Sequence, residues 1–138
     1  DQIRAVAAGE GDIAIANNYY YARMLASSAA KDKQVTDKVK VFWPNQDGRG
    51  AHVNISGAAV TRSAKNKDSA IKLLEFLIGP DAQKIYAEVG YEFPVRDKVE
   101  PGPVVEKMSG FKMDSLPLRI LGENNAEAVR LFDRVGWR

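Results

Sequence analysis

Three consecutive tyrosines, Tyr19, Tyr20 and Tyr21, follow two asparagines in the stretch NNYYYAR at residues 17–23. An isolated phenol titrates near pH ~10, and a positive environment or a bound cation lowers that pKa. The resulting phenolate is a hard anionic oxygen donor, which suits a hard, highly charged ion such as Fe(III). These side chains could therefore bind a metal or an anion, but they could also simply pack, or stack against a sugar.

The tyrosines lie where a short apolar segment is followed by a predicted helix. The segment DIAIAN at residues 12–17 is apolar at both alternating sets of positions, which predicts a strand covered on both faces, as in a parallel sheet. Asn17 and Asn18 are suitable helix caps. Open α/β sheets bind ligands beyond the carboxyl ends of their strands, and a helix N-terminus favours negative charge. Both features place the tyrosines where a ligand would bind.

The rest of the chain alternates predicted strands with predicted helices, which favours an α/β fold. Its 138 residues suit one domain of ~100–200 residues, and 45% of them are hydrophobic, enough for a packed core. The apolar patterns predict strands at 38–44 and 51–60, helices at 66–79, 80–90 and 124–137, and an extended connector at 91–103.

Composition excludes several classes of function. The chain has no cysteine, which removes disulfides, zinc–thiolate sites and thiol catalysis. Twenty basic and eighteen acidic residues give a net charge of +2 with no dense basic block, so nucleic acid is not an expected partner. The serines and threonines lack a His/Asp partner arrangement, which disfavours nucleophilic catalysis. No apolar run approaches the ~18–20 residues that span a bilayer.

Four further side chains could take part in a site. Arg23 lies four residues after Tyr19, so on a helix it shares that face and could stabilise a phenolate or hold a small anion; a solvated arginine is the alternative. His52, the only histidine, is predicted to be structural or solvent-facing, because metal sites need several ligands close together. Asp32 and Asp37 are predicted to lie on a solvated face.

Three segments occur in the order found in one known family: GDIAIANNYYYAR, the stretch from NQDGRGAHVN to YEFPV, and RLFDRVGW. With them the chain resembles, along essentially its whole length, the periplasmic ferric-iron-binding proteins of bacterial ABC importers. In this family two tandem tyrosines after an asparagine ligate Fe(III), so the resemblance assigns that role to Tyr19 and Tyr20. It implies that Tyr21 either lies beside the ligands or packs, without binding the metal, and Arg23 is the other residue that could lie beside them.

The resemblance implies an α/β chain that is part of a two-lobe, type II periplasmic-binding-protein-like fold. Residues 1–52 and 101–138 would belong to the C-terminal lobe, and residues 53–100 would return to the N-terminal lobe. Family members take further ligands from upstream regions and often bind a synergistic anion such as carbonate. The opening DQIRAVAAGEG reads as the end of a helix, so we expect the N-terminal portion to be missing and the iron site to be incomplete in this chain.

The implied function is that of a solute-binding component, not an enzyme, that delivers ferric iron to an ABC permease in the inner membrane. The intact protein would be a monomer, and it would be periplasmic or lipid-anchored outside the cytoplasm. One alternative is a related solute-binding protein for a small organic cation or anion, with the tyrosines as a stacking box. Another is an enzyme or regulatory domain on the same scaffold, since fold does not fix function.

Overall fold

A computed structural model describes residues 2–137, and it divides into two compact units. The first unit comprises the chain up to Trp43 together with Asn54–Phe111, and the second comprises Pro44–Val53 together with the chain from Lys112 onward. Between Gln2 and Trp137 no helix is long and apolar enough to cross a membrane.

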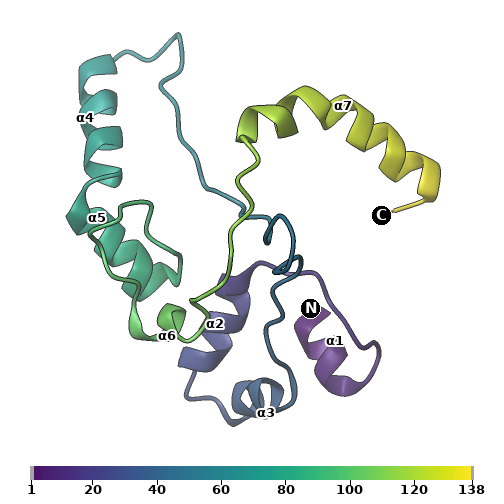
Figure 1. Ribbon diagram of the computed structural model, residues 1–138. Coiled ribbons are helices and arrows are strands. Elements are labelled where there is room, and N and C mark those ends of the chain that lie inside the picture. The colour runs from purple at the N-terminus through teal and green to yellow at the C-terminus, as the bar shows by residue number, and fades with distance from the viewer. Residues whose placement is uncertain (1, 138) are drawn as a thin grey trace. The chain divides into compact units, whose positions relative to one another are not determined.

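Helices make up the regular structure of both units (Figure 1). Those of the first unit are α1 (Gln2–Ala8), α2 (Asn18–Ala26), α3 (Ala30–Lys38), α4 (Lys67–Leu77), α5 (Pro80–Ile85), the π-helical turn η1 (Tyr86–Gly90) and α6 (Pro103–Glu106). The second unit contains α7 (Leu118–Val135).

The helices predicted from apolar spacing are confirmed, with shifted boundaries. Proline takes the first position of α5, where its missing N–H costs nothing, and Gly90 ends the π-helical turn that continues it. The C-terminal helix begins at Leu118, directly after Pro117, and so includes six residues that the apolar pattern had left out. Helix α3 and the short α6, which begins at the last residue of the predicted connector, were not predicted.

The predicted strands are not formed. No residue from 2 to 137 lies in a β-strand, and the only pairing in that range is an isolated parallel bridge between Ala51 and Met113. Residues 12–16 instead run without regular structure between α1 and α2. A strand needs a neighbour to bond its backbone, and the described residues contain no other strand to supply one. The apolar pattern is therefore present without the sheet that it predicts.

The core of the first unit is built around α2. Its buried members are Ile3, Tyr21, Ala22, Met24, Val35 and Met108. Helix α2 contacts α3 and α6, and α1 also packs against α3. Beside this core Trp43 stacks on Phe111 with ring centroids 4.0 Å apart, and its indole N–H donates to the carbonyl oxygen of Met108 at 3.1 Å. The helix that carries the tyrosines is thus fixed along its buried face.

In the second unit a loop is tied to the segment that leads to α7. The Gln46 side chain accepts a hydrogen bond from the Lys112 N–H at 2.7 Å and donates one to the Lys112 carbonyl at 3.2 Å, as a neighbouring strand would. Gly50 has a φ of +97°, and a Cβ on it would lie 2.6 Å from the carbonyl carbon of Met113. Only glycine fits this turn without strain.

Candidate metal site

The first turn of α2 holds all three tyrosines, but it separates their environments. Successive helix residues are rotated by ~100°, so neighbouring side chains cannot share one direction. Tyr21 points into the core and is only 7% exposed, whereas Tyr20 is 48% exposed. The rings of Tyr19 and Tyr20 lie against each other, with centroids 4.3 Å apart and planes tilted by 43°. Two phenols are therefore paired at the start of a helix, and the third is withdrawn from them.

Asn17 occupies the N-cap position, as predicted, but its side chain makes no capping hydrogen bond. Its amide nitrogen donates instead to the Tyr19 phenol oxygen at 3.4 Å. Asn18, the second predicted cap, is the first helical residue, and its buried amide nitrogen has no hydrogen-bond partner within residues 2–137. Asn17 thus contacts a phenol with its side chain and does not cap the helix with it.

Tyr19 influences the ionisation of Tyr20. A hydrogen bond with Tyr19 and the Tyr19 charge raise the pKa of Tyr20, burial adds to the rise, and the Arg23 charge opposes it. The Arg23 guanidinium carbon lies 5.4 Å from the centroid of the Tyr19 ring, within reach of a cation–π interaction. Two neighbouring phenolates repel each other unless positive charge lies between or beside them. The pair is therefore suited to a highly charged cation.

Tyr21 is held by the backbone at the C-terminal end of α3. Its hydroxyl donates to the carbonyl oxygens of Val39 at 2.9 Å and Thr36 at 3.4 Å. Burial, and secondarily the negative charge of Asp37, raise the pKa of Tyr21. A buried phenol with its proton committed to carbonyl oxygens is a poor metal ligand, because ligation requires the deprotonated form.

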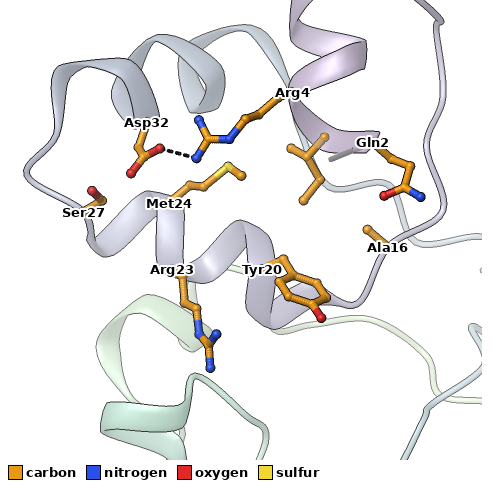
Figure 2. A pocket seen from close by; sticks show the side chains of 9 residues that line it. Gln2, Arg4, Ala16, Tyr20, Arg23, Met24, Ser27 and Asp32 are labelled. Carbon is orange, nitrogen blue, oxygen red and sulfur yellow. Dashed lines mark hydrogen bonds and ion pairs between the residues drawn. The ribbon is translucent and has the colours of Figure 1, made fainter.

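A cavity of about 530 Å³ opens beside Tyr20, between α1 and α2 (Figure 2). Arg4 on α1 and Asp32 on α3 form an ion pair at its wall, with nitrogen and oxygen 2.6 Å apart. Hydrogen bonds from Ser27 and then from Arg4 lower the pKa of the Asp32 carboxyl. Asp32 is 9% exposed, so the prediction of a solvated face is wrong for this residue. Arg23 also lines the cavity.

Other potential ligands are dispersed. Among residues 2–137 no group of three or more His, Cys, Asp or Glu side chains could hold a metal ion. His52 is exposed, as expected of a structural or solvent-facing histidine. The structure thus brings together Tyr19, Tyr20 and Arg23, and it places Tyr21 on the opposite, buried side of α2.

Residues 2–113 match the bacterial extracellular solute-binding proteins, and the chain belongs to that family. Iron uptake protein A2 of Synechocystis sp. (strain PCC 6803) is 45% identical over 139 residues, which covers 99% of this chain and 40% of that protein. The chain thus spans about two fifths of the length of this curated relative, and the proteins that it resembles are solute-binding transport proteins rather than enzymes.

Two solved structures follow the same backbone course. One, from Trichodesmium, is IdiA (FutA) in complex with iron and citrate ligands; it is 52% identical, with a TM-score of 0.92, over 99% of this chain and 43% of that chain. The other is the ferric binding protein from Campylobacter jejuni, which is 44% identical, with a TM-score of 0.94, over 100% of this chain and 44% of that chain. The resemblance seen in the sequence and the type II binding-protein fold class are confirmed. The division of the chain between two lobes stays a prediction.

Proposed function

We propose that this chain carries the tyrosine pair of a ferric-iron-binding protein that serves an ABC importer. Tyr19 and Tyr20 bind Fe(III) through their phenolate oxygens. The observation that carries the proposal is their pairing, with ring centroids 4.3 Å apart, at an accessible helix start. The iron-related names of the Synechocystis, Trichodesmium and Campylobacter proteins support the choice of metal.

The chemistry of capture follows from charge. The Tyr19 interaction raises the pKa of Tyr20 and so disfavours the Tyr20 phenolate without a cation, and Fe(III) binding therefore displaces the Tyr20 proton. Arg23, over the Tyr19 ring, contributes positive charge beside the phenol pair, and it could also hold a small anion such as carbonate. Protonation of the phenolates, or reduction to Fe(II), weakens the bond and permits release.

The partner and the location follow from the family. A protein of this class works outside the cytoplasm, in the periplasm or anchored by lipid, and delivers its solute to a permease in the inner membrane. Capture would take place between two lobes, and release would follow docking on the permease. The protein binds its cargo and does not transform it, so it is a carrier and not an enzyme.

Visible absorption tests the assignment, because phenolate bound to Fe(III) absorbs visible light and an organic cation or anion stacked between the rings does not. Fe(III) citrate added to the 138-residue chain should produce this band. Tyr19→Phe and Tyr20→Phe should each weaken and shift it, since each removes the ionisable oxygen and keeps the ring. Tyr21→Phe and Tyr86→Phe, the latter in η1, are matched controls that should retain the band.

An unchanged band in the Tyr19→Phe, Tyr20→Phe double variant would refute the ligand assignment. Binding without any visible band would favour the organic-ligand alternative. Iron should bind this chain more weakly than it binds the Synechocystis relative, because two phenolates leave most coordination positions of the ion open to water. Equal affinity in a parallel titration would contradict the incomplete ligand set.

A further inference from the structure

The Asn17 side chain contacts a phenol rather than the helix that it precedes. An asparagine at an N-cap position ordinarily accepts a hydrogen bond from a backbone N–H of the first turn. The Asn17 side chain makes no such bond, and its amide nitrogen donates to the Tyr19 phenol oxygen at 3.4 Å. The Asn17 backbone is nevertheless bound to the turn, because its carbonyl oxygen accepts the Tyr20 N–H at 3.2 Å. The amide is therefore carried on backbone that is attached to the turn with both phenols.

The neighbours of Tyr19 contact different parts of its side chain. The Tyr20 ring lies against the Tyr19 ring at a centroid distance of 4.3 Å, and the Arg23 guanidinium carbon lies 5.4 Å from the Tyr19 centroid. These two contacts involve the ring. The phenol oxygen has the Asn17 amide as a partner, and the Tyr19 and Tyr20 side chains also share a hydrogen bond. The atom that would bind a metal therefore has one phenol partner and one amide partner.

Metal binding would remove one of these two partners and keep the other. Two phenolates bound to one ion have lost the proton that the hydrogen bond between the phenols needs. The asparagine amide keeps its two N–H donors, and a phenolate oxygen accepts hydrogen bonds. The Asn17 contact is therefore the one that is compatible with both the free and the iron-bound pair.

The same contact would become stronger when the metal binds. Asn17 is exposed, and 3.4 Å is long for a hydrogen bond between neutral groups, so the contact is weak in the free pair. Hydrogen bonds to an ionised acceptor are shorter and roughly twice as strong. A donor that binds the phenolate more tightly than the phenol stabilises the iron-bound form over the free form. Residues that hold a metal ligand without touching the metal typically contribute about 10–100-fold to metal affinity.

We propose that Asn17 is a positioning residue for iron capture, whose amide orients the Tyr19 oxygen and keeps its hydrogen bond to that oxygen when Fe(III) is bound. The inference rests on the proposed function, because it takes Tyr19 as a ligand. Asn18 provides a contrast within the chain. It has the same side chain one residue further along, but its buried amide nitrogen has no hydrogen-bond partner within residues 2–137. Of the two asparagines, Asn17 is the one that holds a ligand.

Serine substitutions at the two asparagines test the inference. Asn17→Ser keeps a good N-cap residue, but the serine hydroxyl ends one bond closer to the backbone than the amide nitrogen does. When the 138-residue chain is titrated with Fe(III) citrate, this variant should bind iron about tenfold more weakly and shift the visible band. Asn18→Ser, the matched control, should keep the band position and stay within about threefold of the parent affinity. Circular dichroism without iron should be the same for all three proteins, because neither change removes a capping hydrogen bond.

A double-mutant cycle distinguishes an effect that acts through Tyr19 from direct contact of Asn17 with the ion. Tyr19→Phe removes the acceptor of the Asn17 hydrogen bond and leaves Tyr20 as the phenol that can still bind iron. In this background, adding Asn17→Ser should change neither the residual affinity nor the position of the residual band. A general disturbance of the helix start would instead weaken binding in both backgrounds.

Four results would overturn the inference. Parent-like affinity and band in Asn17→Ser, with both altered in Tyr19→Phe, would refute the role of Asn17 and leave the proposed function intact. Equal losses in Asn17→Ser and Asn18→Ser would assign the effect to the helix start. An undiminished effect of Asn17→Ser in the Tyr19→Phe background would make Asn17 a direct contact of the ion or of its anion. A Tyr19→Phe variant that itself binds iron like the parent would refute the proposed function, and this inference with it.

Discussion

Tyr20→Phe and Tyr21→Phe remove the same atom from neighbouring residues, and we expect them to affect different properties. The Tyr21 hydroxyl is buried and donates to the Val39 carbonyl at 2.9 Å, so its loss should lower stability and spare iron binding. The Tyr20 hydroxyl belongs to a half-exposed side chain in the phenol pair, so its loss should spare stability and weaken iron binding.

The size of the stability effect follows from the hydrogen bonds that Tyr21 makes. A net hydrogen bond contributes ~0.5–1.5 kcal/mol, and a carbonyl left without its partner in a partly buried position adds to the cost. The Thr36 carbonyl still accepts from the Lys40 ammonium at 3.1 Å, so the Val39 carbonyl bears most of the loss. We expect Tyr21→Phe to lower the free energy of unfolding by about 1–2 kcal/mol, which corresponds to a decrease of about 2–8 °C in the thermal unfolding midpoint. Tyr20→Phe should stay within about 0.5 kcal/mol.

Alkaline unfolding provides a second reading of Tyr21. Burial, then the Asp37 charge, raise the pKa of Tyr21 above that of a free phenol, so the folded state holds the proton more tightly than the unfolded state does. The stabilisation is complete below the unfolded pKa near ~10 and is lost as the pH rises through the folded pKa. The Tyr20 pKa is raised too, so the comparison is made in a Tyr20→Phe background. In that background, adding Tyr21→Phe should make the free energy of unfolding fall less steeply above pH ~10.

Urea unfolding followed by circular dichroism, and the visible titration with Fe(III), measure the two properties on the same three proteins. The reasoning fails if Tyr21→Phe leaves the unfolding midpoint unchanged, since the buried hydrogen bond would then contribute nothing. It also fails if Tyr21→Phe abolishes the visible band in a protein that remains folded, or if Tyr20→Phe unfolds the chain.

Two further changes test the surroundings of the site and the second unit. Hydrogen bonds from Ser27 and Arg4 lower the Asp32 pKa from 3.8, so the stability they contribute is present above pH ~4 and is lost as the pH falls through the folded pKa. Asp32→Asn should therefore be less stable at pH 7. In urea unfolding followed over pH 2–7, its free energy of unfolding should fall less steeply toward acid pH than that of the parent. Gly50→Ala should destabilise the second unit by at least about 2 kcal/mol, measured by hydrogen exchange, because φ is +97° and the new Cβ meets Met113.

The helices could be predicted from sequence because their signals are local. In α4 the apolar residues recur at helical spacing, and Asn66, the first residue of the predicted range, stands at its N-cap. Proline at the start of α5 acts through its own backbone preference. None of these signals depends on distant parts of the chain. Boundaries were less predictable, since Leu118 and its neighbours carry little apolar periodicity.

The sequence indicates which segments have a strand-like pattern, but it does not indicate that these segments stay unpaired. The pattern at residues 12–16 records the burial that the segment suits, with Ile13 and Ile15 on one face, whereas a sheet requires partner strands that sequence position alone does not supply. The same holds for 51–60, where only Ala51 forms a bridge. The alternation of apolar residues indicates that a segment prefers to be a strand, whereas its pairing depends on whether partner strands are present.

Some features of the candidate site also follow from local sequence, and others depend on residues far apart in the chain. The chemistry of adjacent phenols, and the placement of Arg23 one turn after Tyr19, follow from residue type and helical spacing. The Arg4–Asp32 pair joins residues 28 positions apart on two different helices, and no local pattern connects them. The different roles of three identical side chains depend on which direction from α2 is covered. That direction is fixed by the packing of α3 and α6 against the helix, and the proposed metal would approach from the face left open, where Tyr20 lines the cavity.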